Sequence, residues 1–292
     1  MPLAERAPAK INLGLHVLRQ RPDGDHDVET VLHRIDWADT ITATPADTLS
    51  MTCSDPALPT DEDNLCLRAA LALKEAFDVT AGAALHLDKQ VPYGAGLGGG
   101  SSDAAATLRL LTRLWDLDAD PTRLHAIAAA LGADVPFFLM DAPAALATGR
   151  GDELTPLRSN GAPYRLPHPV LVVAPPIEVA TPDAYAAVTP EDGDRPELPA
   201  LVRSSDLARW RQALANDFEA PIAGGHPAVA AARDWLRDQG ADYVSLTGSG
   251  GAAYGVFEQR AAAERGLEAG RDRNERVHLT SPRSRRATGD GS

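Results

Sequence analysis

The segment from residue 91 to 106 constrains the fold of this chain more than any other, and it reads VPYGAGLGGGSSDAAA. Five of the seven residues from 94 to 100 are glycine, and a helical pattern follows. Glycine has no Cβ, so its backbone can take positive φ and approach a ligand closely. Where such a loop enters a helix, several N–H groups and the positive end of the helix dipole converge. The segment therefore predicts a binding loop for a phosphate chain.

Three other interpretations of this loop fit less well. A flexible linker is seldom placed between a strand and a helix with an apolar stripe. The glycines at 94, 96 and 99 match G-x-G-x-x-G, but a dinucleotide site needs a strand running straight into the first glycine and a second strand after one helix. Here Pro92 interrupts the approach, and residues 103–131 predict two helices with no strand between them. A P-loop needs a lysine after the glycines, and none follows.

Composition narrows the class of protein. The 292 residues are enough for one large domain or two of ordinary size, and 44% of them are hydrophobic. A net charge of −13 disfavours nucleic-acid or membrane-surface binding. The two cysteines, Cys53 and Cys66, form no C-x-x-C motif and are expected to be buried thiols in a reducing compartment. No stretch approaches 18 apolar residues, so we predict a cytoplasmic protein with no nucleic-acid or membrane partner.

Periodicity places the polar candidates in the first half of the chain. Residues 9–17 alternate between apolar and polar, which predicts a strand with Lys10 and Asn12 on its polar face. A solvated strand face explains this pattern equally well. Asp63 or Asn64 can cap a helix that runs to about residue 77, and a helix with one apolar stripe follows the glycine loop. Asp134 stands just before a short helix that begins near Pro136, so the local sequence alone favours an N-cap role for it.

The second half predicts a compact α+β unit. Strands are expected at 170–174, 243–246, 252–257 and 276–279, and helices at 181–185, 206–220, 227–239 and 259–268. A segment rich in proline, glycine and asparagine at 155–169 marks a boundary. We therefore predict a first domain at 1–160, a second at 161–279, and a frayed, disordered tail at 280–292. The turn at 247–251 is expected either to close over a site or to be an ordinary hairpin turn.

Three stretches together resemble the GHMP kinases: PAKINL at 8–13, the glycine loop at 94–102, and LTGSG at 246–250. RPDGDH at 21–26, GLGGGSS at 96–102 and GADVPF at 132–137 are most similar to the branch that phosphorylates a cytidine diphosphate-linked methylerythritol in non-mevalonate isoprenoid synthesis. The resemblance covers residues 6–279. It implies an α+β, two-domain fold, with an N-terminal domain like ribosomal protein S5 domain 2 and a ferredoxin-like C-terminal domain.

The resemblance also implies the site and its cofactors. ATP and Mg²⁺ would be bound at the loop, Asp134 would accept the proton of the substrate hydroxyl, and Lys10 would be a fixed cation beside it. No protein ligand of the metal is assigned. Expected ATP contacts are Pro92, Gly94, Gly96, Leu97, Gly98, Gly99, Gly100, Ser101 and Ser102, with Asn64 and Lys89 on the adenine side. Expected substrate contacts are Asn12, His26, Thr181 and Tyr185. The chain departs from the family at Asp25, where an aromatic residue is usual, so one wall of the cytidine pocket is missing or comes from elsewhere.

Other functions remain open at this point. The chain could be a mevalonate- or homoserine-type kinase of the same superfamily, or a catalytically silent nucleotide-binding protein on the same fold. The G-x-G-x-x-G interpretation would instead predict an NAD-dependent oxidoreductase. The small-molecule partners are the polyol substrate and ATP, and we expect a monomer or a weak homodimer.

Overall fold

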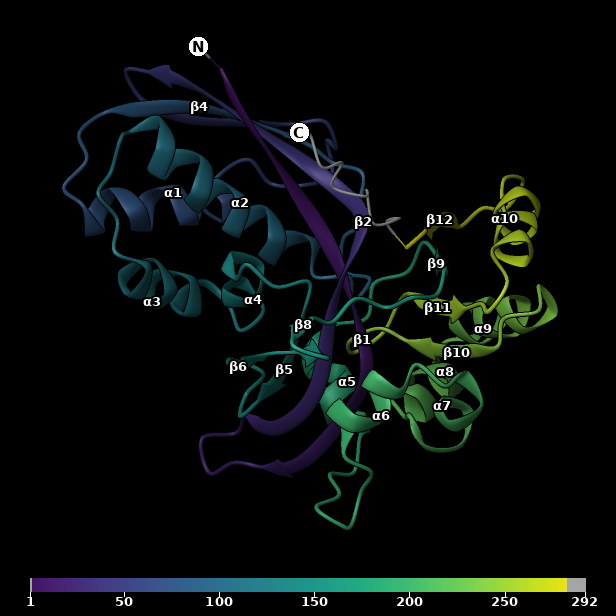
Figure 1. Cartoon of the computed structure of the whole chain (residues 1–292). Helices are drawn as coiled ribbons and strands as arrows, with labels where there is room; N and C mark the ends of the chain where they lie inside the picture. Colours follow the sequence, from purple (N-terminus) through teal and green to yellow (C-terminus); the bar gives the residue numbers. More distant parts are fainter. Residues whose placement is uncertain (1, 283–292) are drawn as a thin grey trace, which may run out of the picture.

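The computed structural model describes residues 2–282, and two sheets organise the chain (Figure 1). The first sheet has six strands in the order β3-β4-β2-β5-β6, with β1 paired to β2. Its strands are β1 (Leu3–Gln20), β2 (His26–Ala46), β3 (Leu49–Cys53), β4 (Gly82–Asp88), β5 (Ala144–Thr148) and β6 (Glu153–Pro156).

A long antiparallel hairpin of β1 and β2 runs through the molecule (Figure 1). The alternation at 9–17 is confirmed as part of β1. The sequence between 26 and 46 predicts two separate strand pieces, at 31–35 and 40–44, but β2 is one continuous strand. The register shifts between Pro8 and Lys10 and again between Leu13 and Leu15. Such bulges let a long ribbon bend and twist, so the same hairpin can contribute side chains to the cores of both halves of the chain.

Four helices form the layer beside the first sheet: α1 (Leu65–Ala76), α2 (Gly99–Leu114), α3 (Pro121–Leu131) and α4 (Val135–Leu139). Helix α2 packs on β1 and β2, and the other three helices pack around α2. Local signals place two of their starts, at the cap predicted for Asn64 and at the helix start that Asp120 and Pro121 predict. The Asn64 side chain accepts from Cys66 N, and the Asp120 side chain accepts from Thr122 N. The apolar stripe of α2 is buried in a core shared with α1 and the sheet. This packing fixes the position of the glycine loop at the start of α2.

The second sheet has four antiparallel strands in the order β10-β11-β9-β12. They are β9 (Val170–Ala174), β10 (Tyr243–Leu246), β11 (Ala253–Val256) and β12 (Arg276–Thr280). The helices of this region are α5 (Thr181–Ala187), α6 (Leu198–Ser204), α7 (Leu207–Ala213), α8 (Glu219–Gly225), α9 (Pro227–Asp238) and α10 (Arg260–Ala269). This strand order and the β-α-β-β-α-β succession are those of a ferredoxin-like domain, as expected.

The prediction of one helix at 206–220 is wrong, because the chain leaves the helix to pair with β1. Asn216 forms a bridge with Leu15, and its side-chain amide donates to the carbonyls of Leu246 and Gly248. Its Oδ1 accepts from Phe218 N, which starts the next helix. These contacts come from distant parts of the chain, so helical periodicity alone could not reveal them.

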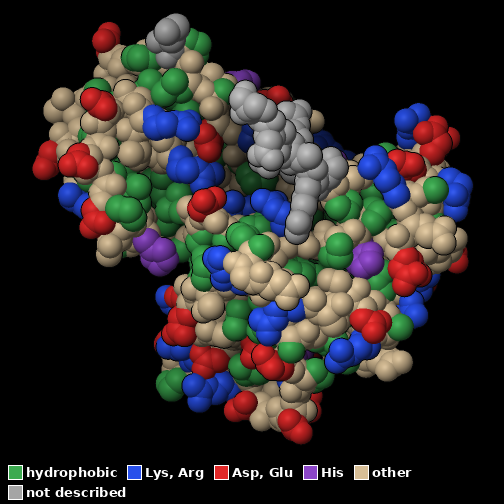
Figure 2. All heavy atoms as spheres, in the orientation of Figure 1, with side chains coloured by type: hydrophobic (Ala, Val, Ile, Leu, Met, Phe, Trp, Pro, Cys, Tyr) green, Lys and Arg blue, Asp and Glu red, His purple; other side chains and the backbone are tan. Residues whose placement is uncertain are grey.

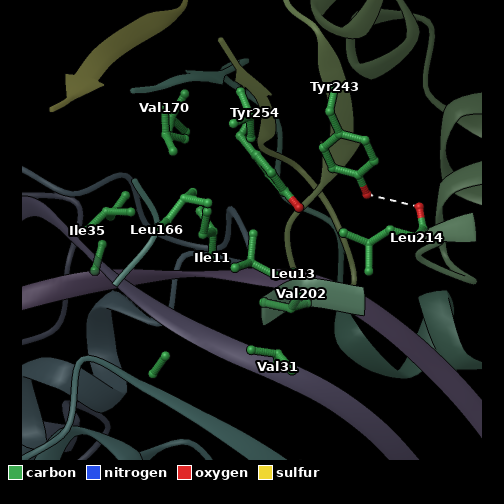
Figure 3. Close-up of a cluster of buried hydrophobic side chains, with 14 of the residues drawn as sticks. Ile11, Leu13, Val31, Ile35, Leu166, Val170, Val202, Leu214, Tyr243 and Tyr254 are labelled. Carbon is green, nitrogen blue, oxygen red and sulfur yellow. Dashed lines mark hydrogen bonds between the residues drawn. The ribbon is translucent and has the colours of Figure 1, made fainter. Parts of the chain in front are cut away.

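An apolar cluster joins the two sheets (Figure 3). Ile11, Leu13 and Val31 of the long hairpin meet Val170 and Tyr254 of the second sheet. The predicted boundary at residue 160 falls inside a small hairpin of β7 (Arg158–Ser159) and β8 (Ala162–Pro163), between the two sheets. The domain division stays a prediction. Thr280 belongs to β12, and residues 283–292 of the expected tail lie outside the described residues.

The surface and the helices give two further facts. Acidic and basic side chains are interspersed over both lobes on the face drawn in Figure 2. Within residues 2–282, no helix is both long enough and apolar enough to cross a membrane.

Candidate active site

The glycine loop borders a cavity of about 390 Å³ that both halves of the chain help to line. Gly98 is the N-cap of α2 and has a φ of 68°, and Gly94 and Gly96 also take positive φ. The loop residues that line the cavity are Pro92, Tyr93, Gly94, Ala95, Gly96, Leu97, Gly98, Gly99, Gly100 and Ser101. Eight of the nine predicted ATP contacts of the loop are therefore brought together here.

The turn at 247–251 packs directly on the loop, which explains why glycine is needed there. A Cβ at Gly96 would lie 2.1 Å from the Thr247 carbonyl oxygen. The Thr247 hydroxyl donates to the Gly96 carbonyl at 3.0 Å, and Ala252 N donates to the Ala95 carbonyl at 3.0 Å. Gly248 and Ser249 line the same cavity. The turn from the second sheet thus forms part of the cavity wall.

Lys10 and Asp134 meet at this cavity. The Lys10 ammonium lies 3.5 Å from Asp134 Oδ2 and donates to Asn12 Oδ1 at 2.7 Å. Lys10 is buried, whereas the Asp134 side chain is 31% exposed. The two side chains therefore form an ion pair at the edge of the cavity.

The carboxylate of Asp134 is not used as a helix cap. Asp134 occupies the N-cap position of α4, but its side chain forms no capping hydrogen bond, and its backbone is αR with φ −80° and ψ −15°. An N-cap side chain normally adopts extended backbone and accepts from the first turn. Its oxygens are therefore available to a ligand in the cavity.

Asn12 ties the first sheet to the turn at 247–251. Its Oδ1 accepts from Gly248 N at 2.8 Å as well as from Lys10, and its Nδ2 donates to the Thr30 hydroxyl at 2.9 Å. Asn12 also lines the cavity. These bonds position Lys10, and the substrate contact predicted for Asn12 stays a prediction.

A second cavity, of about 820 Å³, adjoins the first and shares Thr181, Tyr185 and Arg150 with it. The rings of His26 and Tyr185 stack with centroids 4.7 Å apart. Burial raises the pKa of Tyr185 to about 12, with a smaller contribution from the carboxylates of Asp134 and Asp25. Three predicted substrate contacts, His26, Thr181 and Tyr185, are thus brought together.

Arg150 is a member of this site that sequence reasoning missed. It lines both cavities, and its guanidinium lies 3.3 Å from Asp25 and 3.0 Å from Asp152. Asp25 stands where the resemblance expects an aromatic ring, and in the structure its carboxylate pairs with the planar guanidinium of Arg150. The glycines on either side, Gly149 and Gly151, both take positive φ and were the available sequence signal of a special loop.

Three predicted ATP contacts do not line the cavity. The Ser102 hydroxyl is buried and donates to the Pro8 carbonyl at 2.7 Å. The Asn64 side chain caps α1 and donates to the Pro59 carbonyl. Lys89 lies behind the loop, 2.6 Å from Asp39 and 2.8 Å from Asp103. In the structure these three side chains support the loop and its surroundings, and the ATP contacts expected of the three residues stay predictions.

The cluster of Lys89, Asp39 and Asp103 is closed to solvent. Burial opposes the charge on Lys89, but Asp103 and Asp39 outweigh it and raise the pKa of the lysine. Burial also raises the pKa of Asp103 to about 7, against the pull of Lys89. Asp39 Oδ1 accepts from Gln90 N and Val91 N, so the cluster anchors the backbone that enters the glycine loop.

Comparison with known proteins agrees with this arrangement. Residues 64–148 match the GHMP kinases N terminal domain, and residues 198–275 match GHMP kinases C terminal. A 4-diphosphocytidyl-2-C-methyl-D-erythritol kinase of Salinibacter ruber is 65% identical over 96% of this chain and 98% of its own length.

Solved structures show the same fold. A 4-(cytidine 5'-diphospho)-2C-methyl-D-erythritol kinase superposes with a TM-score of 0.79 at 36% identity, over 95% of this chain and 98% of that one. The mevalonate kinase of Methanococcus jannaschii superposes with a TM-score of 0.70 at 10% identity, over 97% and 99% of the two chains, which shows the shared fold alone. The chain belongs to the GHMP kinases and, within them, to the 4-diphosphocytidyl-2-C-methyl-D-erythritol kinase family.

Proposed function

We propose that the protein transfers the γ-phosphate of ATP to the 2-hydroxyl of 4-diphosphocytidyl-2-C-methyl-D-erythritol. The observation that carries this proposal is the meeting of the glycine loop with Lys10 and Asp134 at one cavity. Phosphoryl transfer asks a protein mainly to position its reactants and to stabilise charge. The family membership favours this acceptor over mevalonate and homoserine, and it favours an enzyme over a silent binding protein.

The loop would hold the phosphate chain through backbone groups. The N–H groups of the first turn of α2 have no partner within the helix, and the helix dipole favours an anion at that end. Because glycine lines the loop, phosphate oxygens can come close to the backbone. The γ-phosphate would then lie on the side of the loop where Asp134 and Lys10 stand.

Mg²⁺ fits the donors at this cavity. Among residues 2–282 no group of three or more His, Cys, Asp or Glu side chains could hold a metal. Hard oxygen donors line the cavity, among them the partly exposed Asp134 carboxylate and the Ser101 hydroxyl. Mg²⁺ commonly binds through one carboxylate, substrate phosphates and several waters. When bound, it would neutralise charge on the phosphate chain.

Asp134 would take the proton of the acceptor hydroxyl as the oxygen attacks. For this role the carboxylate must come within hydrogen-bond distance of that hydroxyl in the productive complex. Lys10 would stabilise the ionised carboxylate and the charge that grows on the attacking oxygen. Asn12 holds the ammonium in place through the 2.7 Å hydrogen bond.

The second cavity would bind the cytidine part. The stacked pair of His26 and Tyr185 offers an aromatic surface for a pyrimidine. Arg150, held by Asp25 and Asp152, presents a planar cation to the same space and would supply the wall that the resemblance expects from an aromatic residue.

The test is ADP release with three acceptors: the complete cytidine-linked substrate, 2-C-methyl-D-erythritol 4-phosphate without the cytidine part, and mevalonate. We expect turnover with the complete substrate and a kcat/KM at least about a hundredfold lower with the other two, because binding energy from the remote cytidine is used at the reacting centre. A kcat/KM for mevalonate equal to that for the complete cytidine-linked substrate would overturn the substrate assignment.

A further inference from the structure

A third cavity, of about 460 Å³, shares no lining residue with the two described above. Its walls come from the start of β1, the middle of β2, α2, the segment at 141–143, the segment that leads into β9, and residues 280–282 at the end of the described chain. Four arginines line it: Arg6, Arg34, Arg109 and Arg165. We call this cavity the arginine cleft. Such a concentration of cations is unexpected in a chain of net charge −13.

Two hydrogen-bond donors in the cleft are buried and have no partner among the described residues. One is Arg34 Nε, whose neighbouring Nη2 donates to the carbonyls of Phe137 and Met140 at 2.7 Å. The other is His33 Nδ1. His33 Nε2 accepts from Leu166 N at 3.0 Å, so the neutral ring carries its proton on Nδ1. Buried donors in folded proteins normally have partners, which indicates that an acceptor belongs here.

The carboxylates nearby do not neutralise the arginines. Within residues 2–282, Arg109 alone of the four forms an ion pair, with Glu5. Asp36 is already bound by His278 and Thr280. The pKa of Arg34 is lowered to about 10, mainly by burial. The positive charges of Arg109 and Arg165 also lower this pKa, and the negative charge of Asp141 raises it by less. Among the described residues, only two carboxylates, Asp36 and Asp141, line the cleft beside the four arginines, so a bound anion would stabilise the excess of positive charge.

The shape and chemistry of the cleft select the class of ligand. Guanidinium groups match the oxygens of phosphate in a paired, planar geometry. Apolar side chains, among them Ile35, Leu166 and Val170, line the same space. A cavity of this volume is larger than one phosphate group needs. We propose that the arginine cleft binds a small molecule that carries a diphosphate group and a short organic part, at a site separate from the active site.

Arg165 is the best position for a test because its side chain is exposed, so replacing it does not disturb the core. Arg34→Gln would also remove the contacts with Phe137 and Met140 and could unfold the protein. Arg209 is a matched control, since it is exposed on α7 and does not line the cleft. The probe is inorganic pyrophosphate, added to the full chain with the active site saturated by ADP.

Calorimetry of the wild type, Arg165→Gln and Arg209→Gln measures the binding of pyrophosphate to the cleft directly. We expect pyrophosphate to bind the wild type and Arg209→Gln with equal Kd, and Arg165→Gln about tenfold more weakly, as the loss of a hydrogen bond to a charged group would give. The His33 ring signal in a ¹H–¹³C spectrum should shift on binding in the wild type. An unchanged Kd in Arg165→Gln, an unmoved His33 signal, or loss of all binding under saturating ADP would each overturn the proposal. None of these outcomes depends on the phosphate acceptor assigned above.

Discussion

Two lysines face the glycine loop from opposite sides, and only one of them is open to a ligand. A Cβ at Gly98 would touch the Lys10 side chain, and a Cβ at Gly99 would lie 3.0 Å from Lys89 Nζ. Lys89 is 3% exposed and pairs with two carboxylates that are themselves buried. Lys10 has one carboxylate, at 3.5 Å, and that carboxylate is 31% exposed at the cavity.

This difference separates a structural cluster from a chemical one. Around Lys89, the lysine and Asp39 form their hydrogen bonds within the protein, and the side chains of Lys89, Asp39 and Asp103 are almost fully buried. Around Lys10, the Asp134 carboxylate has spare capacity beside the place where a phosphate chain would lie. We therefore expect the lysine and carboxylates of the Lys89 cluster to act on stability, and Lys10 and Asp134 to act on turnover.

The largest effect is expected from Lys89→Met. The change leaves two buried carboxylates without their cation, and breaking a buried pair in this way costs about 3–5 kcal/mol of unfolding free energy. Urea denaturation measures this loss. Arg68→Met, at an exposed arginine on α1, is the control and should stay near wild type. A stable Lys89→Met protein with a raised KM for ATP would show that Lys89 contacts the nucleotide after all.

Lys10→Met should act on the rate instead. Loss of one fixed group that stabilises transition-state charge lowers kcat by about 10²–10³. The variant should unfold cooperatively at a temperature close to that of the wild type, with Arg68→Met again as the control. Near-normal kcat would remove Lys10 from the chemistry.

His33 extends the comparison to a buried group outside the active-site cavity, whose titration should act on stability. Burial lowers the pKa of His33 to about 4, with a further contribution from Arg165. The folded state then binds fewer protons than the unfolded state between about pH 4 and pH 6.5, so stability is lost as the pH falls through that window, by up to about 3 kcal/mol. His33→Gln should flatten this part of the pH profile of unfolding, and the exposed His125→Gln should not. A slope that survives in His33→Gln would contradict the assignment.

The smallest effect is expected from Arg150→Gln. Its guanidinium is half exposed, so the loss of its contact with a base should raise the KM for the cytidine-linked substrate about threefold. The kcat and the KM for ATP should not change. Arg158→Gln, at an exposed arginine outside both cavities, serves as the comparison. A change in kcat alone would place Arg150 among the groups that act on the transfer itself.

Sequence reasoning succeeded where the signal is local. The glycine loop, the caps at Asn64 and Asp120, and the strands of the second sheet all follow from residues close together in the chain. It failed where a distant contact decides. The resemblance implied an ATP contact for Lys89, and no nearby residue pointed to its buried pair with Asp39, because Asp39 is 50 residues away. The break at Asn216 and the place of Arg150 likewise depend on strands and cavities that no short segment encodes.

The most direct test of the account is a rapid-quench, single-turnover measurement on Asp134→Asn with saturating ATP and acceptor. The substitution keeps the size of the side chain but removes its ability to take the hydroxyl proton. We expect the rate of phosphoryl transfer to fall by about 10²–10⁴ while the Kd for ATP stays near that of the wild type. A transfer rate close to wild type, or a loss explained entirely by weaker ATP binding, would contradict the role of Asp134 as the group that takes the hydroxyl proton beside the glycine loop.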